Sequence, residues 1–544
     1  MKNINLKKAF SAIICAAMAA SMLCGCGNES GKGKKNAEPI VTVNAVPEAA
    51  DLGLDDLAKL TSTQELSYSI TSSLAKSNKT IGDCNPISSN LFFADPTSVE
   101  YNGRLYVYGT CDTEQFIKNG RKGDNGYGGI DSLSCFSTDD MVNWTYHGDI
   151  KVNYLCSWAG VSWAPSIVSR PTESGETEFF LYFTLGGGGI GVIKANSPLG
   201  PWTDPLGHPL ISGDTAELKD DPICWVFDPG VVIDDNGVGW IAFGGGDPQQ
   251  EGETGMNTRN CRIARLGEDM VSLDSKIAVI EAPYHFEANE LNYIDGKFYL
   301  TYCSNWKPRD EWSDEYSPYE KPQMCTMCYM VSDDPLKTDS WEYKGEYLMN
   351  PTYYGLSFSN NHTHLQEFGG KYYLFYQNVS LLDNMRLGNA SGYRSINVDA
   401  LEVDTKKSEF KMGTMTSKGV EQLKKLDPFK TNEGETANVT AGIEYKKVSG
   451  SMSAIGTDGS WTVVCGADFG KDGAKLFAAR VMGEGIIEIR LDDKDSAPVG
   501  AIQFSSAEDY QTVYCELNEA ITGEHDVYFV FGGNESHLDQ WQFK

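Results

Sequence analysis

LFFADPTSVEYNGRLYVYGT (Leu91–Thr110) contains the pattern from which the architecture of this chain is predicted. It opens with an acidic residue before proline, Asp95-Pro96, and closes with an alternating, aromatic-rich strand pattern. A glycine turn followed by such a strand returns at ETEFFLYFT, NGVGWIAFGG, DGKFYLTYC and GGKYYLFYQ, which begin at Glu176, Asn236, Asp295 and Gly370. The turn glycines are roughly 60 to 75 residues apart, which is enough for four strands and their loops. Five copies predict an all-β, five-bladed propeller, which protects its strand edges by radial closure.

Three of the five copies have a carboxylate just upstream: Asp95, Asp228 in WVFDPG and Glu287 in HFEANE. An isolated Asp-Pro usually caps a turn. In a propeller, however, equivalent positions of different blades meet at one end of the central channel. Three carboxylates there repel one another and raise at least one pKa. One ionised base and one protonated acid are what glycoside hydrolysis requires.

The length of the chain indicates how many domains it has, and its net charge limits the kinds of partner that it binds. A chain of 544 residues is too long for one core, so at least two domains are expected. A net charge of −30 argues against nucleic acid and anionic membrane surfaces as partners. It suits a neutral polymer substrate and leaves carboxylates for hard cations such as calcium.

Residues 1–26 form the pattern of a signal peptide, with Lys2, Lys7 and Lys8 before an apolar core. Leu23-Cys24-Gly25-Cys26 resembles a bacterial lipobox, which implies cleavage before Cys26 and lipidation of its sulfur. The alternative is an ordinary secretory signal cut nearby. Both predict export, and the first predicts a cell-surface lipoprotein held to the bacterial membrane by its N-terminal lipid alone.

The domain organisation follows from composition. Residues 27–84 are rich in Ser, Lys, Asn, Ala and Asp and are interpreted as a low-complexity tether. Residues 85–427 carry the blade pattern. Residues 428–544 contain short strands such as KLFAARVM, GIIEIRLD and HDVYFVFGG at a spacing typical of a β-sandwich (jelly-roll) module.

Several long motifs together resemble a known family. They are ADP with YNGRLYVY, MVNWTYHG, WAGVSWAPS, GGGGIGVIKANSPLGPWTDPLG, WVFDPGVVIDDNG, HFEANELNYIDGKFYLTYC and NNHTHLQEF. In this order they resemble glycoside hydrolase family 43, specifically its arabinoxylan arabinofuranohydrolases that carry a carbohydrate-binding module of family 6. The resemblance implies a five-bladed propeller, hydrolysis with inversion and no cofactor for the chemistry.

The resemblance also implies roles for the three carboxylates. Asp95 would be the general base that activates water, and Glu287 the general acid that protonates the leaving oxygen. Asp228 would modulate the pKa of the acid and hold its orientation. Glu290 is the nearby competitor for the acid, but the family pattern places the acid directly after the aromatic residue, here Phe286.

Further residues match substrate-binding positions of the family. His362 matches an axial histidine in the channel that faces either a calcium ion or a water cluster. Arg394 in GYRS matches the arginine that contacts the sugar beside the acid. Aromatic faces stack on sugar rings, and the candidates here are Trp158, Trp163, Trp225 and Phe227.

The C-terminal unit resembles the family 6 module at NEGET, GSW, GADFGKDGAKLFAARV, IEIRLD and LDQWQF. Glu433, Glu435 and Asp539 match carboxylates that hold a structural calcium in such modules. Its binding cleft departs from the pattern, because Tyr510 stands where a tryptophan is frequent and His537 replaces a common asparagine. Two alternatives stay open: the module binds sugar weakly, or it only braces the propeller.

The leading hypothesis is an α-L-arabinofuranosidase that removes side chains from arabinoxylan or its oligosaccharides. A β-xylosidase acting on xylo-oligosaccharides is the nearest rival, because arabinofuranose and xylopyranose present similar hydroxyl arrangements. An endo-arabinanase fits the attached module less well. From another class, the chain could be a non-catalytic glycan-binding surface lipoprotein, although a pure binder has no need of an acid and base pair.

Overall fold

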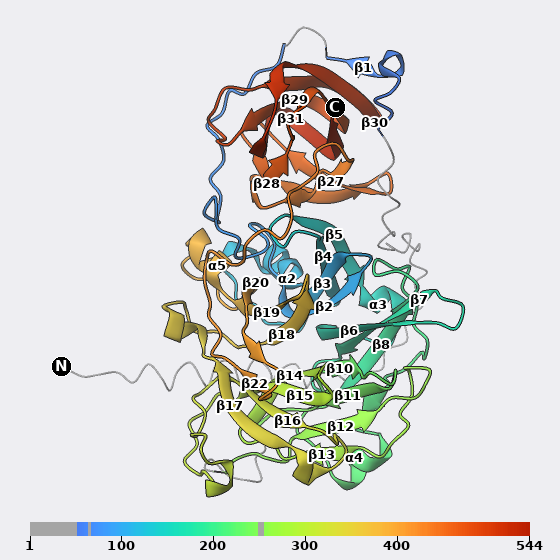
Figure 1. Cartoon of the computed structure of the whole chain (residues 1–544), viewed down its shortest axis with the longest axis vertical. Coiled ribbons are helices and arrows are strands. Elements are labelled where there is room, and N and C mark those ends of the chain that lie inside the picture. The colour runs from blue at the N-terminus through green and yellow to red at the C-terminus, as the bar shows by residue number, and fades with distance from the viewer. Residues whose placement is uncertain (1–51, 64–66, 248–254) are drawn as a thin grey trace, which may run out of the picture.

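The computed structural model describes residues 52–63, 67–247 and 255–544. The predicted signal peptide, with Cys26, and the first half of the predicted tether lie outside the described residues. The described chain forms a five-bladed β-propeller followed by a β-sandwich, drawn below and above, respectively, in Figure 1. The predicted fold class is therefore confirmed.

Four blades are four-stranded within the described residues, blade 1 gaining a fifth strand from the module, and the last blade has three. The strands of blades 1 and 2 are β2 (Ala94–Tyr101), β3 (Arg104–Thr110), β4 (Ser132–Thr138), β5 (Trp144–Lys151), then β6 (Trp163–Pro171), β7 (Thr177–Thr184), β8 (Gly189–Ala195) and β9 (Ile211–Ser212). Blades 3 and 4 contain β10 (Gly230–Ile233), β11 (Gly239–Phe243), β12 (Cys261–Arg265), β13 (Ala278–Ile280), then β14 (His285–Ile294), β15 (Lys297–Ser304), β16 (Met327–Ser332) and β17 (Glu342–Leu348). Blade 5 contains β18 (Thr363–Phe368), β19 (Lys371–Asn378) and β20 (Ser395–Ala400), followed by the hairpin β21 (Val403–Asp404) and β22 (Glu409–Phe410).

Short helices lie in the loops between strands. The described α-helices are α2 (Asp112–Asn119), α3 (Val152–Leu155), α4 (Ala216–Asp220) and α5 (Ser380–Met385), and the 3₁₀ turns are η1 (Leu57–Lys59), η2 (Gly120–Lys122), η4 (Asp314–Tyr316), η5 (Thr338–Ser340) and η6 (Pro351–Tyr354). Of these, α2 leaves blade 1 directly after β3 and contributes a residue to the site described below.

The repeated turn of the sequence has a simple conformational reason. In blades 1, 4 and 5 the turn between the first two strands has positive φ at both central residues: Asn102-Gly103, Asp295-Gly296 and Gly369-Gly370. A two-residue turn of this kind matches the right-handed twist of a hairpin, and Asn, Asp and Gly accept it most readily. These turns fix the register of the strands that follow, so that one face of each blade packs on its neighbour.

The first strands of the blades line the centre of the propeller and contact one another in a closed ring from β2 through β6, β10, β14 and β18 back to β2. Four of them have a non-glycine residue at positive φ in or just before their first few residues: Asp95 (54°), Ala164 (35°), Asp228 (49°) and Ala288 (64°). The pairing register shifts at this point in β2, β6 and β14. Bulges of this kind re-aim a side chain. Asp95 and Asp228 are themselves the positive-φ residues of their blades, whereas Glu287 directly precedes the positive-φ residue of its blade, Ala288.

Neighbouring blades are joined at this level by side-chain to backbone hydrogen bonds. The hydroxyl of Thr110 in blade 1 accepts the N–H of Ala164 in blade 2 (2.8 Å), and that of Thr184 in blade 2 accepts the N–H of Asp228 in blade 3 (2.8 Å). Gln377 Oε1 in blade 5 accepts the N–H of Asp95 in blade 1 (2.6 Å), which closes the ring. The backbone of the two aspartates is thus held from the preceding blade.

The C-terminal module encloses one large core, which includes Phe477, Phe529 and Trp541. Its long strands bend across the module, with register shifts near Gly483 and Gly485. The described strands of this unit are β23 (Asn432–Glu433), β24 (Thr436–Ala437), β25 (Val439–Ala441), β26 (Glu444–Val448), β27 (Ser451–Gly456), β28 (Trp461–Asp468), β29 (Ala474–Leu491), β30 (Gly500–Ile521) and β31 (Glu524–Phe543).

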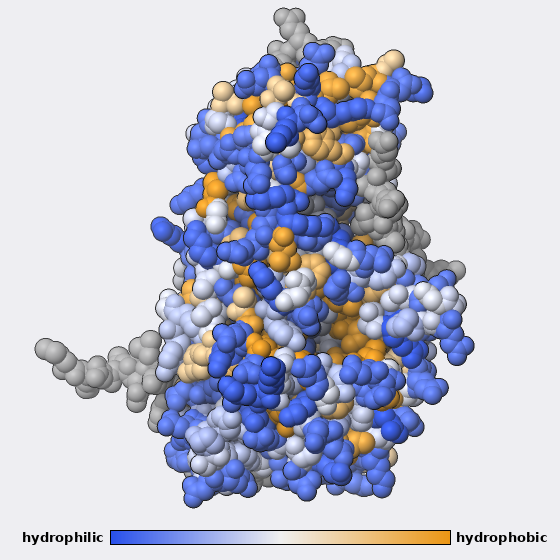
Figure 2. All heavy atoms as spheres, in the orientation of Figure 1, coloured by the Kyte–Doolittle hydropathy of each residue, from blue (hydrophilic) through white to orange (hydrophobic). Residues whose placement is uncertain are grey.

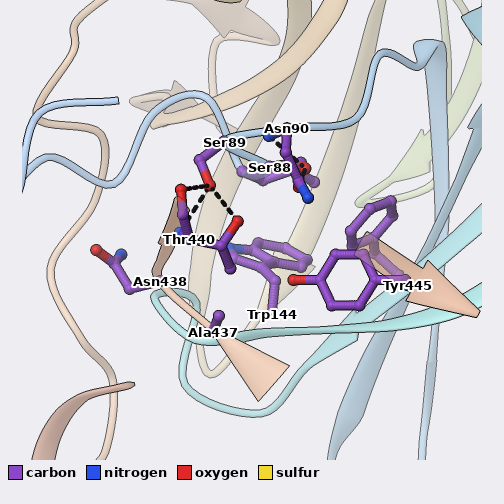
Figure 3. Close-up of a pocket in the computed structure, with 10 residues that line it drawn as sticks. Ser88, Ser89, Asn90, Trp144, Ala437, Asn438, Thr440 and Tyr445 are labelled. Carbon is purple, nitrogen blue, oxygen red and sulfur yellow. Dashed lines mark hydrogen bonds between the residues drawn. The ribbon is translucent and has the colours of Figure 1, made fainter. Parts of the chain in front are cut away.

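The two units share a sheet. Strand β24 of the module pairs antiparallel with β5 of blade 1, through Thr436 with Thr145 and Ala437 with Trp144. Beside this junction lies a cavity of about 10 Å³ (Figure 3), where the hydroxyl of Ser89 accepts the N–H of Thr440 at 2.8 Å. A space of this size holds about one water molecule. The cavity is therefore too small for a sugar, and the two units pack closely at the junction.

The segment before the propeller is packed on the module, and we name residues 52–63 and 67–84 the N-terminal strap. Strand β1 (Thr61–Ser62) pairs parallel with β30, and Leu52 and Leu54 are buried against Ala478. Figure 1 shows the strap, in blue, running along the side of the sandwich to the propeller. The prediction of a tether over residues 27–84 is therefore wrong for the described part, because apolar residues such as Leu52 and Leu54 are buried on the module.

The strap continues into the junction. Asp458 accepts backbone and hydroxyl hydrogen bonds from Thr71 and Ser72, and the indole of Trp461 donates to the carbonyl of Ala75 at 2.7 Å. Lys79, although charged, is 3% exposed and donates to the carbonyls of Cys84 and Asn438. Burial lowers the pKa of Lys79 to about 8.

Figure 2 shows that the surface on this side is mostly hydrophilic, with a group of hydrophobic side chains exposed beside β6 and β8 near the centre of the propeller. None of the described helices is both long enough and apolar enough to cross a bilayer.

Candidate active site

Asp95 lies at the start of β2, and both of its carboxylate oxygens contact neighbouring side chains. Its Oδ1 accepts a hydrogen bond from Arg394 Nη1 (2.8 Å) and lies 3.3 Å from His362 Nδ1, while its Oδ2 accepts from the hydroxyl of Thr110 (2.7 Å). Burial alone would raise the pKa of this carboxyl, but the charge of Arg394 and the hydrogen bonds of His362 and Thr110 hold it well below its usual range. Asp95 is therefore ionised at neutral pH.

Asp228 precedes β10 in blade 3. Its Oδ2 accepts the backbone N–H of Ala288 (2.7 Å), and its own carbonyl accepts from the Asn289 side chain (3.0 Å). Burial, with a smaller contribution from the Asp95 charge, raises the pKa of Asp228 to about 6 against the opposing effect of His362. The carboxylate is thus fixed to the residue that directly follows Glu287.

Glu287 lies in β14 of blade 4, with its Oε1 3.0 Å from the indole nitrogen of Trp306, which donates to it. Burial and then the negative charge of Asp228 raise the pKa of Glu287 to about 8, although the Trp306 hydrogen bond and His362 act in the opposite direction. Asp95, Asp228 and Glu287 keep exposures of 5%, 6% and 6%, so each still reaches solvent. The site thus combines an ionised carboxylate with a protonated one at pH 7.

Glu290 and His364 form a second pair of an acid and a histidine near the carboxylates. Ser98 N–H donates to His364 Nε2 (3.1 Å), so Nε2 is the acceptor and Nδ1 carries the proton that is donated to Glu290 Oε1 (2.6 Å). Glu290 is therefore engaged with His364, whereas the side chain of Glu287 is held by Trp306. His362 lies beside Asp95, and its pKa is raised because interaction with Asp95 outweighs burial, which acts to lower it.

Arg394, which the resemblance assigns to the sugar, is bonded to a carboxylate of the site. Its Nη1 lies 2.8 Å from Oδ1 of Asp95, the predicted base. It is buried in an ion pair with Asp112, the first residue of α2, and its guanidinium lies 5.0 Å from the centre of the Tyr127 ring. The contact with Asp95 forms because blade 5 closes the ring beside blade 1, so the segment before β20 lies next to β2.

Of the aromatic candidates, Trp158 packs away from the carboxylates, whereas Trp163, Trp225 and Phe227 lie next to site positions. The indole of Trp158 donates to Asp204 (2.6 Å) and stacks on Phe183, so it is packed on the core of blade 2. Trp163 precedes Ala164 at the start of β6, and its indole donates to the carbonyl of Tyr127. Trp225 is half-buried and packs edge-on against the buried Phe227 and against Phe286, the residue before Glu287.

The sequence did not indicate four residues that hold the site. Thr110 and Trp306 donate to the carboxylates of Asp95 and Glu287, Gln377 accepts the backbone N–H of Asp95, and Asp112 accepts from Arg394. Thr110 and Gln377 lie near the ends of second strands that the repeat pattern did predict, and that position is the signal that could have found them. Asp112 and Trp306 lie in loops without any repeated pattern.

The propeller with an ionised and a protonated carboxylate in one site defines a glycoside hydrolase. Residues 84–389 match the family "Glycosyl hydrolases family 43", and residues 433–544 match "Carbohydrate binding module (family 6)". The chain belongs to glycosyl hydrolase family 43, as the resemblance had indicated.

Curated relatives support the same family. The chain is 36% identical over 491 residues to an arabinoxylan arabinofuranohydrolase of Paenibacillus polymyxa, covering 85% of this chain and 74% of the relative. It is 34% identical over 494 residues to one of Bacillus subtilis (strain 168), covering 86% and 93%. A crystal structure of a Bacillus subtilis arabinoxylan arabinofuranohydrolase with cellotetraose has a TM-score of 0.79 at 33% identity, covering 88% of this chain and all of that one.

The carboxylates predicted to bind calcium lie in the C-terminal module. Among the residues that the structure describes, no group of three or more His, Cys, Asp or Glu side chains is arranged to hold a metal ion. In the module, burial and the Asp539 charge raise the pKa of Glu433 to about 7, and Glu435 Oε2 has no hydrogen-bond partner within the described chain. Asp539 itself is paired with Arg480. The oxygen donors suit calcium, but Arg480 competes for one of them.

Proposed function

We propose that this protein hydrolyses α-L-arabinofuranosyl side chains from arabinoxylan or its oligosaccharides, with inversion at the anomeric carbon. The observation that carries the proposal is the pairing of an ionised Asp95 with a protonated Glu287 in one propeller channel. Two relatives named arabinoxylan arabinofuranohydrolases, at 36% and 34% identity over most of this chain, support the choice of sugar and polymer.

In the proposed mechanism Asp95 is the general base. Its Oδ1 is occupied by Arg394 and its Oδ2 accepts one bond from Thr110, which leaves a lone pair of Oδ2 for a water proton. The water oxygen forms the new bond to the anomeric carbon as its proton passes to Asp95. Glu287 gives its proton to the glycosidic oxygen, whose bond to the anomeric carbon breaks.

Asp228 acts in this mechanism as the modulator of the acid. Its negative charge keeps the proton on Glu287, and its hydrogen bond from Ala288 fixes the backbone beside the acid. Trp163, Trp225, Phe227 and His362 are proposed to contact the sugar, since they are next to site positions in the first strands or their leading turns. Trp158 is the weaker candidate, because its indole nitrogen is taken by Asp204.

The test compares three substrates with the full chain: arabinoxylan, linear xylo-oligosaccharides and linear arabinan. Release of arabinose from arabinoxylan alone, with the inverted anomer in early proton NMR spectra, supports the proposal. Release of xylose from xylo-oligosaccharides would identify a β-xylosidase, and cleavage within arabinan an endo-acting enzyme. Binding of arabinoxylan without any hydrolysis would identify a glycan-binding protein.

We also propose that calcium binds Glu433 and Glu435 in the module, with Asp539 as a third ligand in competition with Arg480. Support comes from the unpaired Glu435 Oε2 and the concentration of carboxylates. When the wild type has been stripped of metal with a chelator, adding calcium back should raise its melting temperature. The Glu435→Gln variant should lose that response. The same titration with His362→Gln tests the channel calcium that the resemblance implies at His362.

Export and lipid anchoring through Cys26 are proposed from the signal pattern in residues 1–26. In a bacterial host the full chain should partition with detergent and carry a lipid, whereas Cys26→Ala should be secreted or remain unprocessed. A wild-type chain that is released without lipid would indicate the ordinary secretory signal.

A further inference from the structure

Asp112 is the first residue of α2, outside the blades and outside every motif of the sequence. It is fully buried. Its Oδ2 accepts from the backbone N–H and from Nε of Arg394 (both 3.0 Å), and its Oδ1 accepts from Nη2 (2.9 Å). Three bonds from one residue to one carboxylate define the orientation of the guanidinium plane, because a planar fork and a planar carboxylate match in two bonds at once.

The orientation matters because of what the other end of the guanidinium does. Nη1 donates to Asp95 Oδ1 at 2.8 Å. Because Oδ1 is taken in this way, Oδ2 of Asp95, which accepts from Thr110, is the oxygen left to receive a proton. The guanidinium carbon lies 5.0 Å from the centre of the Tyr127 ring, and this cation–π contact also holds the guanidinium in place.

Asp112 also balances charge. Arg394 lies between two carboxylates, Asp112 and Asp95, and all three side chains are almost completely buried. Removing one partner of a buried charge set leaves the remaining groups uncompensated. Without Asp112, the guanidinium would have Asp95 as its remaining carboxylate partner among those that the structure shows, and would be free to turn toward it.

We propose that Asp112 is a positioning residue for the hydrolytic reaction: by holding Arg394 at three points, it fixes which oxygen of Asp95 faces the water. Asp112 touches neither the sugar nor the water. This inference rests on the role of Asp95 as general base given under the proposed function, and it assigns a task to a residue of the connection between β3 and β4 of blade 1.

The test is a double-mutant cycle on the full chain: wild type, D112N, R394K and D112N/R394K. The substrate is whichever aryl glycoside the wild type cleaves, an arabinofuranoside or a xyloside. D112N should lower kcat about 100-fold with little change of KM, the size expected when a catalytic group is misplaced by about 1 Å. D112E, which restores the carboxylate, should recover part of kcat.

The cycle separates positioning from a merely structural role. If Asp112 acts through Arg394, the double variant should be no slower than R394K alone, because the two losses do not add. D140N is the matched control: Asp140 is also a buried carboxylate of blade 1, but it accepts from Val142 and Asn143. Its kcat should stay within about twofold of wild type, as for sites remote from the reacting atoms.

The proposal is overturned if D112N keeps its kcat while its melting temperature falls, or if the losses of D112N and R394K multiply in the double variant. Failure of the proposed function is a separate result. A wild type that cleaves the xyloside but not the arabinofuranoside rejects the arabinofuranosidase, and the cycle then proceeds on the xyloside.

Discussion

Asp228 accepts the backbone N–H of Ala288 at 2.7 Å and so binds the residue that follows Glu287. The carboxylate that raises the pKa of Glu287 by its charge therefore also fixes the backbone from which Glu287 extends. Both effects depend on the backbone at equivalent positions of blades 3 and 4, where Asp228 and Ala288 have positive φ.

The acid and the base should differ in their dependence on the leaving group. Glu287→Gln should lower kcat by about 10²- to 10⁴-fold on a natural linkage. It should lower kcat much less on a nitrophenyl glycoside, whose leaving group needs no proton. Asp95→Asn should lower both rates alike. Glu290→Gln is the control, and leaving-group dependence in that variant would move the acid to Glu290.

Activity of the wild type should follow a bell-shaped curve in pH. Asp228 must be ionised, so kcat/KM should rise as pH passes about 6, and Glu287 must be protonated, so it should fall as pH passes about 8. Asp95, whose pKa is held well below its usual range, should contribute no limb in this window. A flat profile between pH 5 and about 9 would contradict these assignments.

Asp228→Asn should move the alkaline limb to lower pH. The variant removes a negative charge that raises the pKa of Glu287, so the acid loses its proton earlier, by about 1 to 2 pH units. The measurement is kcat/KM against pH with a substrate that needs the acid. An alkaline limb that stays in place would show that Asp228 acts by geometry alone.

Trp306→Phe should move the same limb in the opposite direction. The indole hydrogen bond stabilises the ionised form of Glu287, and bonds to charged groups contribute about 1.5–3 kcal/mol. Its loss should raise the alkaline limb by about 1 pH unit or more, since one unit corresponds to about 1.4 kcal/mol. Trp312→Phe, whose indole donates to the Tyr319 carbonyl in the same blade, should leave the limb unchanged.

The strap should contribute to stability. Leu54→Ala removes a side chain that is 4% exposed, and such truncations cost about 2–5 kcal/mol. Ile81→Ala, in the same segment but 41% exposed, should cost less than about 0.5 kcal/mol. Urea unfolding of the full chain compares the two variants, and equal stabilities would show that the strap is no more than a tether.

The sequence was sufficient for the features that repeat. The turns at Asn102-Gly103 and Asp295-Gly296 and the aromatic strands after them predicted the blades, since each repeat carries its own local signal. The positions of Asp95, Asp228 and Glu287 followed from the same repeat. Their neighbours did not, because a contact such as Trp306 to Glu287 joins a loop to a strand without a pattern in either.

One prediction was wrong, and one contact was not predicted, for a common reason. Residues 27–84 were expected to form a tether, but their described part packs on the module, and no pattern indicated that Arg394 would bond to Asp95. Both outcomes depend on closure between distant parts of the chain: the strap against β30, and blade 5 against blade 1. A local pattern contains no information about such long-range pairing.

The strap also has a consequence for the order in which the protein matures. Ser67 donates its backbone N–H to Gln503, a partner 436 positions later in the chain. A ribosome must therefore finish nearly the whole polypeptide before the strap can find its place, so one of the earliest described segments to be synthesised is among the last to dock.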